Sequence, residues 1–217
     1  PLNPTAKLRT SVLFVPGSEG YDTAESYYSM YLGTDDENRA MAQELLAEAG
    51  VSTPIDVKFW FPTGNVRRTN EFELIKTSAD SVGFNVIQDD EPNWEFTGLV
   101  YPDVNPHDAT IFAWAATSLA VSGDDQYLTL GGPSNWTGYD NPEVDALLEE
   151  LNVAVKTEDQ LRIRLAIEEQ LAQDAYNITI FQFPGLTWWD NSVTSVDPSL
   201  LVPYYFWNFW DWTPTAG

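Results

Sequence analysis

The sequence predicts an α/β fold in which helices flank a mixed sheet. Residues 55–60 alternate between apolar and polar side chains and predict a strand, and a helical stripe over 65–81 separates it from a second strand beginning at Phe84. This strand–helix–strand order predicts a right-handed crossover onto a parallel sheet. Residues 109–115 are nearly all apolar, as in a strand covered on both faces, so we expect this strand in the middle of the sheet.

Three further helices are predicted from their capping residues and apolar spacing. Thr34, Asp35 and Asp36 offer N-cap oxygens for a helix over 37–49, which Gly50 ends. Asn141 is expected to cap a second helix, with Pro142 at its first position and the inward stripe Val144, Leu147, Leu148 and Leu151. A third helix is predicted over 157–175, with Leu161, Leu165, Ile167 and Leu171 facing inward and Arg162, Glu168 and Glu169 facing outward.

Shorter segments complete the expected organisation of the chain. Residues 1–34 are predicted to form loops and turns with one short strand at 11–15, and residues 178–181 predict a last strand. A loop over 116–140, rich in Ser, Gly, Asp and Thr, is long for a compact domain and is therefore a candidate functional segment. The tail over 186–217 is dense in Trp, Tyr, Phe and Pro, which favours burial in a core or an interface over stacking on sugars.

Composition excludes several classes of function. The 217 residues contain 33 Asp and Glu against 10 Lys and Arg, a net charge of −23 that repels nucleic acid and anionic lipid. The acidity indicates either a solvated surface or attraction of cationic ligands, and the first use is the commoner one. No segment is apolar enough to span a bilayer, and no leader pattern begins the chain, so we expect a mature protein or a fragment.

The residues offer little support for catalysis or metal binding. The chain has no Cys, its single histidine is His107, and no Gly-flanked Ser or phosphate-binding glycine pattern is present. Gly131 and Gly132 precede a proline and predict a turn. The acidic run 89–91 lacks the spacing of a calcium loop and is interpreted as solvated charge. We therefore expect no enzyme activity, no catalytic residues, no metal and no cofactor.

Two stretches carry a resemblance to a known family. Residues 107–114, His-Asp-Ala-Thr-Ile-Phe-Ala-Trp, and residues 135–148, with Gly-Tyr and then Asn-Pro-Glu-Val-Asp-Ala-Leu-Leu, resemble bacterial extracellular solute-binding proteins of family 5. That family includes the dipeptide- and oligopeptide-binding proteins of ABC importers. Residues 42–50 are similar to a further helix of the family and residues 164–179 to its closing helix and strand, so the resemblance spans most of the chain.

The resemblance implies a type II periplasmic-binding-protein-like lobe. Family members have two lobes that close on a ligand, and here residues 1–185 are expected to form most of the second lobe, with 186–217 returning toward the first. The resemblance also implies a membrane permease as partner and an extracellular or periplasmic location at the cell surface, with a lipid anchor on the full-length protein. Isolated, the chain is expected to self-associate through its aromatic tail.

Ligand contacts are expected at the end of the strand beginning at 109 and in the loop that follows it. The candidate ligand-binding residues are Ala113, Trp114, Thr117, Ser118, Asp124, Asp125 and Asn135. In peptide-binding members the residue three after the cleft Trp is an Asp that pairs with the peptide amine, whereas Thr117 stands at that position. A hydroxyl cannot supply this charge-assisted pairing.

Two interpretations of the ligand follow from this departure. Either Asp124 or Asp125 holds the amine of an oligopeptide, or the ligand is an oligosaccharide, for which stacking on Trp and hydroxyl contacts suffice. Asn135 is expected either to contact the ligand or to brace the loop through its amide. The rival function is an extracellular carbohydrate-active enzyme or accessory module, suggested by nine Trp and many carboxylates.

Overall fold

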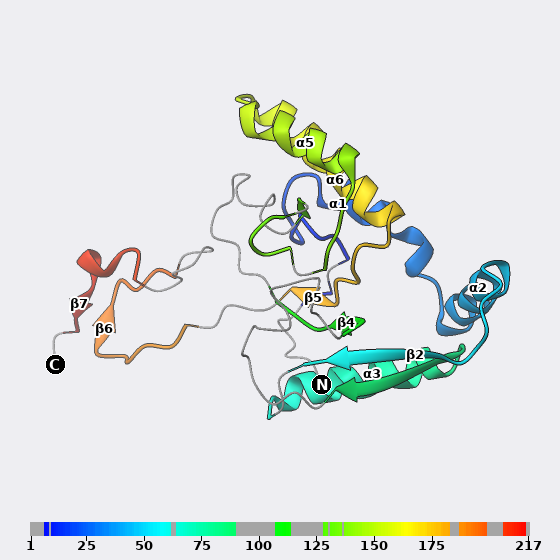
Figure 1. Ribbon diagram of the computed structural model, residues 1–217. Helices are drawn as coiled ribbons and strands as arrows, with labels where there is room; N and C mark the ends of the chain where they lie inside the picture. The colour runs from blue at the N-terminus through cyan, green and yellow to red at the C-terminus, as the bar shows by residue number, and fades with distance from the viewer. Residues whose placement is uncertain are drawn as a thin grey trace. The chain divides into compact units, whose positions relative to one another are not determined.

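The computed structural model describes residues 7–8, 10–61, 64–89, 107–113, 128–129, 131–135, 137–182, 187–198 and 206–215 (Figure 1). The described residues belong to two compact units. The sheet unit comprises described residues between 28 and 113 and between 128 and 142, and the helical unit comprises those between 7 and 27 and between 143 and 215. Within the described chain, no helix combines the length and apolar character needed to cross a membrane.

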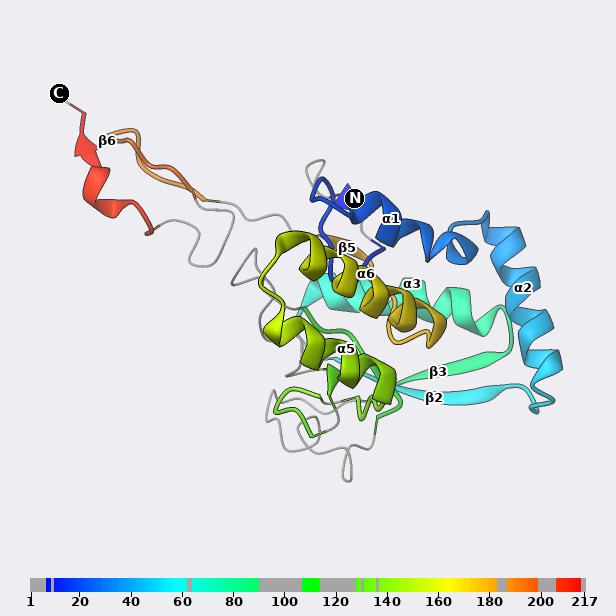
Figure 2. The same cartoon turned by 90° about the horizontal axis from the view of Figure 1, so that it is seen from above.

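A three-stranded parallel sheet organises the sheet unit. The strands β2 (Ile55–Trp60), β3 (Phe84–Asp89) and β4 (Ala109–Thr110) are ordered β3-β2-β4, and α3 (Val66–Asp80) connects β2 to β3. Figure 2 shows β2 and β3 side by side along their length. The predicted crossover onto a parallel sheet is therefore confirmed. Two neighbouring parallel strands require such a connection, because the chain must return to the same end of the sheet before it enters the second strand.

The prediction of a long central strand over 109–115 is wrong for the residues described. Strand β4 ends at Thr110, and among the described strands it is β2 that lies in the middle. The apolar run has a different cause, because Ile111 is buried in the core although it lies beyond the strand. Burial without ladder pairing gives the same continuous apolar pattern as a central strand.

Aromatic side chains fill the core between α3 and the sheet. The Phe72 ring of α3 lies 5.5 Å from the Phe59 ring and 5.3 Å from the Phe61 ring, measured between centroids. Val86 and Ile111 complete the buried cluster. Removing an aromatic ring from such a core costs about 3–5 kcal/mol, so Phe72 fixes how α3 sits on the strands. Val66, the first residue of α3, is 74% exposed.

The helix α2 (Asp35–Glu48) begins two residues earlier than predicted and is capped as expected. The Thr34 side chain accepts a hydrogen bond from the Glu37 backbone N–H, and the Glu37 carboxylate accepts one from the Thr34 backbone N–H at 2.8 Å. Gly50 follows the helix with a φ of 64°, a conformation that glycine adopts without strain. None of the residues of α2 is buried, so its apolar residues make no core. A short 3-10 turn, η1 (Ser29–Tyr31), precedes α2 in this unit.

The helical unit contains α1 (Tyr21–Ser26), α5 (Pro142–Val153) and α6 (Thr157–Gln173), with α1 packed on α6. The predictions of α5 and α6 are confirmed, with α6 ending two residues early. Two short antiparallel pairs join β1 (Lys7–Leu8) to β5 (Phe181–Gln182), and β6 (Val193–Thr194) to β7 (Thr213–Pro214). A second 3-10 turn, η3 (Phe209–Asp211), precedes β7.

Three predictions in the helical unit are wrong. Residues 11–15 form a bend rather than a strand, and the Ser11 hydroxyl accepts a hydrogen bond from the Phe14 N–H at 2.9 Å. Strand β5 starts only at Phe181, and Ile178 is 89% exposed. Glu168, predicted to face solvent, is fully buried on α6. Its carboxylate is needed inside, where it accepts hydrogen bonds from the N–H groups of residues 12 and 13.

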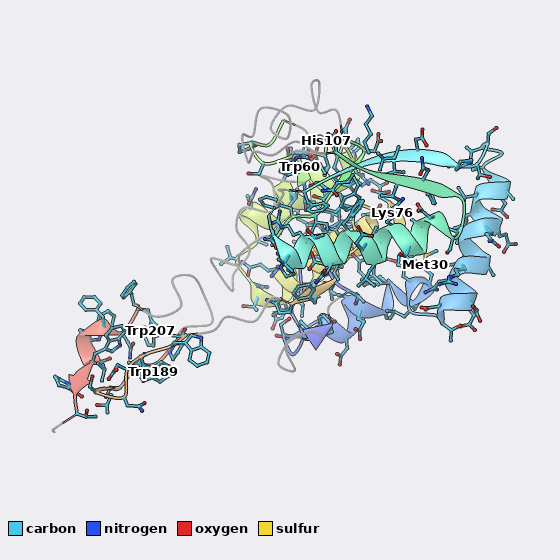
Figure 3. The ribbon with its side chains drawn as sticks, turned by 90° about the horizontal axis from the view of Figure 1, so that it is seen from below. Met30, Trp60, Lys76, His107, Trp189 and Trp207 are labelled. Carbon is cyan, nitrogen blue, oxygen red and sulfur yellow. The ribbon has the colours of Figure 1, made fainter. Side chains whose placement is uncertain are left out.

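Exposed aromatic residues characterise the tail. Its paired strands are braced by Asn208, which is 4% exposed, donates a hydrogen bond to the Ser195 carbonyl at 2.9 Å and accepts one from the Trp212 indole N–H at 3.0 Å. Figure 3 shows Trp189 and Trp207 on this segment. The large side chains that are 45% or more exposed here are Trp188, Trp189, Phe206, Trp207, Phe209 and Trp210. Among the described residues of the tail, these aromatic side chains are not buried in a core of this chain.

Candidate functional site

The carboxyl ends of the three parallel strands form the candidate site. Trp60 at the end of β2 pairs in register with Asp89 at the end of β3 and with Thr110 at the end of β4. Parallel strands place their carboxyl ends at one edge of a sheet, and in open α/β sheets that edge is where ligands bind. The segment leading to the predicted contacts leaves the sheet at this edge.

His107 packs into this edge beside Trp60. Its ring stacks on the Trp60 indole with 5.8 Å between centroids and an interplanar angle of 27°, and its Nδ1 lies 3.0 Å from a carboxylate oxygen of Asp89 (Figure 3). The His107 side chain is 4% exposed and Trp60 is 2% exposed. These contacts connect His107, just before β4, to the ends of the other two strands. Because the imidazole is buried, its role is in packing.

Asp108 fixes where β4 begins. Its carboxylate accepts a hydrogen bond from the Lys58 backbone N–H at 2.7 Å, and its own N–H donates to the Lys58 carbonyl at 2.9 Å. The carboxylate therefore satisfies a donor of β2 at the position just before the paired residues of β4. An aspartate leading this strand sets the register in which the following residues reach the edge.

Ala113 is the one candidate contact that the structure describes at this edge. It is exposed and lies three residues beyond the end of β4. The neighbouring Phe112 ring lies 6.0 Å from the guanidinium carbon of Arg68, a distance at which a cation attracts an aromatic face. Arg68 is 5% exposed, and burial lowers the pKa of its guanidinium, with the adjacent Arg67 adding to the shift. The first turn of α3 thus supports the chain that leads to Ala113.

Asn135 uses its whole side-chain amide to brace the loop around it. The Nδ2 group donates to the carbonyls of Thr129 at 2.9 Å and Tyr139 at 2.8 Å. The Oδ1 atom accepts from the Thr137 hydroxyl at 3.2 Å and from the Tyr139 N–H at 3.1 Å. Asn135 is 5% exposed, and these four bonds match the number that an amide side chain ordinarily makes. Loop bracing is the role that the geometry supports, and a direct ligand contact stays a prediction.

The other predicted contacts lie outside the described residues. These are Trp114, Thr117, Ser118, Asp124 and Asp125. Their assignment to the ligand site stays a prediction. The sequence did not predict that Trp60, His107 and Asp89 lie together. The signal that could have predicted it is the parallel register, because residues at the ends of neighbouring parallel strands lie side by side.

The helical unit has a groove on its surface. An open groove of about 440 Å³ is lined by apolar side chains of α6 and by Tyr27, with charged groups at its margin; its lining residues are Tyr27, Glu158, Leu161, Arg162, Leu165, Ala166 and Glu169. Burial raises the pKa of Tyr27, and the negative charges of Glu169 and Glu168 add to the rise. The two leucines predicted to face inward on α6, Leu161 and Leu165, line this groove.

No cluster of metal-binding side chains occurs in the part of the chain that the structure describes. Within it, no three His, Asp or Glu side chains come together in a way that would hold an ion. In particular, the Asp89 carboxylate of the acidic run faces His107.

The fold is that of solute-binding proteins. No family model matches the chain, and no curated protein matches it in sequence. OppA of Haemophilus influenzae, solved in complex with RPPGFSPFR, is 17% identical, with a TM-score of 0.62 over 83% of this chain and 35% of that one. A periplasmic oligopeptide-binding protein of Thermotoga maritima, solved with mannohexaose bound, is 18% identical, with a TM-score of 0.62 over 81% of this chain and 36% of that one.

The oligopeptide-binding protein AppA of Bacillus subtilis, solved in complex with a nonapeptide, is 15% identical, with a TM-score of 0.61 over 82% of this chain and 37% of that one. This chain therefore spans about a third of the length of the structures it resembles. At these identities the likeness defines the fold, and the periplasmic-binding-protein-like lobe expected from the sequence is confirmed.

Proposed function

We propose that this chain is a lobe of a solute-binding protein that captures an oligopeptide or oligosaccharide and delivers it to the permease of an ABC importer. The single observation that carries the proposal is the position of Ala113. This residue lies at the carboxyl edge of the parallel sheet, in a chain whose fold matches that of solute-binding proteins. That edge is the expected ligand edge of such a sheet. The protein performs no chemistry on its ligand.

Trp114 is proposed as the stacking surface of the site, supported by Thr117, Ser118 and one of the two acidic loop residues, Asp124 or Asp125. The described neighbours of this segment favour a rigid base for it. Asp108 sets the strand register and Arg68 packs on Phe112, two residues before Trp114. A positioned aromatic side chain at a rigid edge loses little entropy when it binds a ligand.

The ligand class is proposed to include neutral oligosaccharides as well as peptides. Thr117 offers a hydroxyl where peptide-binding members of the resembling family place a carboxylate, and hydroxyl contacts suit sugars. The similar Thermotoga maritima protein was solved with mannohexaose, so this fold accommodates both chemistries.

The aromatic tail is proposed to pack on the rest of the full-length protein, as the resemblance implies for 186–217. Its support is the exposure of six large aromatic side chains, among them Trp188 at 88%. Apolar area of this kind usually marks an interface. The full-length protein is proposed to act outside the cytoplasmic membrane, held there by a lipid anchor.

A thermal-shift screen of the full-length protein with peptides and oligosaccharides tests the proposal. A ligand present at about a hundred times its Kd raises the free energy of unfolding by about 2.7 kcal/mol, a rise in Tm of roughly 2 °C for a protein about three times as long as this chain. Chromatography should recover the ligand unchanged. A hydrolysed oligosaccharide would support the carbohydrate-active enzyme instead, and no shift with either ligand class would contradict binding.

The variant Thr117→Asp tests the site assignment. If Thr117 faces the ligand, the new carboxylate should raise the affinity for peptides with a free amino terminus by about tenfold or more, because charge-assisted hydrogen bonds are about twice as strong as neutral ones. Thr117→Asn is the matched control, since it has the same shape without the charge. Equal affinities of the two variants, measured by calorimetry, would remove Thr117 from the site.

A further inference from the structure

We propose that this protein is built to fold in concentrated salt, with a layer of cations held by its exposed carboxylates. The net charge is −23 on a chain of 24.4 kDa. Even if every Lys and Arg neutralised one carboxylate, that charge would remain. Self-repulsion of this size opposes the compact state, because unfolding moves the charges apart.

Part of the excess charge lies on the solvent-facing helix α2. In α2 the carboxylates Asp35, Asp36, Glu37, Glu44 and Glu48 are accompanied by one basic residue, Arg39. None of the residues of α2 is buried. In contrast, α3 packs on the core and has as many basic as acidic residues, with described ion pairs from Arg67 to Glu71 at 2.6 Å and from Lys76 to Asp80 at 2.7 Å. The charge imbalance is therefore a property of the outer surface.

Like charges face each other along these helices. Glu44 and Glu48 are both exposed and lie four residues apart on α2, and Asp145 and Glu149 have the same spacing on α5. Side chains at this spacing are neighbours on a helix surface. Like charges there destabilise a helix by about 0.2–0.5 kcal/mol per pair in dilute buffer.

The C-terminal ends of α2 and α6 carry the sign of charge that the helix dipole disfavours. Glu48 is the last residue of α2 and Asp174 is the C-cap of α6, and no basic residue occupies the last turn of α2, α5 or α6. A negative charge at a helix C-terminus is unfavourable, and salt screens the effect. Two helices with an acidic C-terminus indicate a surface suited to a medium in which such repulsion is suppressed.

Salt can stabilise such a chain by screening its surface charges and by supplying cations that accumulate around its carboxylates, and these two effects occur at different salt concentrations. Screening of surface charges is largely complete once the Debye length falls to a few ångströms, which occurs near 1 M salt, and most of the change occurs below about 0.3 M. Accumulation of cations around a dense carboxylate surface continues to respond above that range. The proposal therefore requires stabilisation that extends into the molar range and that depends on the carboxylates.

The test is the Tm of the purified chain without ligand, measured from about 0.1 M to about 3 M KCl. We expect Tm to rise throughout and to gain roughly 10 °C or more between the lowest and highest concentrations. The test variant replaces exposed glutamates by glutamine at Glu19, Glu44, Glu48, Glu73, Glu149 and Glu169. Because charge repulsion scales with the square of net charge, we expect the salt dependence to fall by roughly half.

The matched control replaces the same glutamates by aspartate, which keeps every charge and should keep the full salt dependence. A Tm that stops rising by about 1 M KCl would contradict the proposal, as screening alone then accounts for it. Equal slopes for the glutamine variant and the wild-type chain would also contradict it, because exclusion of salt from any protein surface then suffices. Full stabilisation by millimolar Mg²⁺ or Ca²⁺ would indicate a discrete divalent site and overturn the proposal. None of these outcomes depends on the ligand proposed above.

Discussion

Glu168 joins two segments that are far apart in the sequence. Its fully buried carboxylate accepts hydrogen bonds from the backbone N–H groups of Val12 at 2.6 Å and Leu13 at 2.8 Å. Arg164, one turn earlier on α6, donates to the Leu13 carbonyl at 2.9 Å, and its guanidinium carbon lies 5.1 Å from the centre of the Phe14 ring. The two side chains together hold residues 11–14 on α6.

The variant Glu168→Gln should destabilise the chain by about 2–4 kcal/mol. Hydrogen bonds to a charged acceptor contribute about 1.5–3 kcal/mol each, and glutamine presents an N–H group where one backbone N–H needs an acceptor. Urea unfolding measures the change. Glu169→Gln is the control, since Glu169 is the exposed neighbour and should change stability by no more than about 0.5 kcal/mol. Equal losses in the two variants would show that the buried carboxylate is not what holds the loop.

Sequence reasoning placed Glu168 on the outside of α6 because the pattern assigns charged residues to solvent. Its partners are backbone groups more than 150 residues away, so no local pattern contains them. At Asn135, in contrast, the partners lie within six residues, and bracing of the loop was one of the two roles predicted from sequence. Local hydrogen bonds are foreseeable from sequence, and long-range ones are not.

At the scale of elements, a side-chain clip joins α3 to β3. The Asp80 carboxylate accepts hydrogen bonds from the Lys76 ammonium at 2.7 Å and from the Val86 N–H at 3.0 Å, and Lys76 also donates to the Val86 carbonyl at 2.7 Å. The bond from Lys76 is the main cause that lowers the pKa of Asp80 below its ordinary value of 3.8. The clip sets the turn between the helix and the strand.

The variant Asp80→Asn should lower stability at neutral pH, and the difference from wild type should vanish in acid. Because the folded-state pKa is depressed, the carboxylate stabilises the fold above the unfolded-state pKa, and this contribution is lost as pH falls through the folded-state value. The expected window lies below pH 3.8. Urea unfolding of both proteins between neutral pH and strong acid measures the difference in their free energies of unfolding. A difference that persists in acid would show that the shape of the side chain at position 80, and not its charge, causes the loss of stability.

Helices were predicted well because their signals are local. The cap at Thr34 and the stop at Gly50 act within one turn, and the structure has both of them. Strands need a partner, which explains why residues 11–15 and 178–180 were misassigned. Apolar residues there satisfy the strand pattern without a neighbouring strand to pair with.

At the scale of the whole chain, the aromatic tail is expected to cause self-association when the chain is isolated. Sedimentation velocity should show a weight-average mass that rises with concentration, and the double variant Trp188→Ser, Trp210→Ser should remove the rise. These side chains are 88% and 65% exposed. Val155→Ser is the control, because Val155 is 92% exposed but lies outside the tail. Association that survives the double variant would show that another surface is responsible.

The candidate site was predictable in its position more than in its construction. A strand beginning at Ala109 was predicted from the sequence, and the structure has it, with Ala113 exposed three residues beyond its end. The packing of His107 between Trp60 and Asp89 was not foreseen. It joins residues from three separate segments, and only the sheet register brings them together.

The central claim is that ligand binds at this edge. Hydrogen–deuterium exchange of the full-length protein, with and without the ligand that the thermal-shift screen identifies, tests it most directly. Binding should slow amide exchange in residues 109–118, which lead from β4 into the predicted contacts, and leave α2 unchanged. Protection confined to the α6 groove or to the tail, with residues 109–118 exchanging as before, would contradict the account.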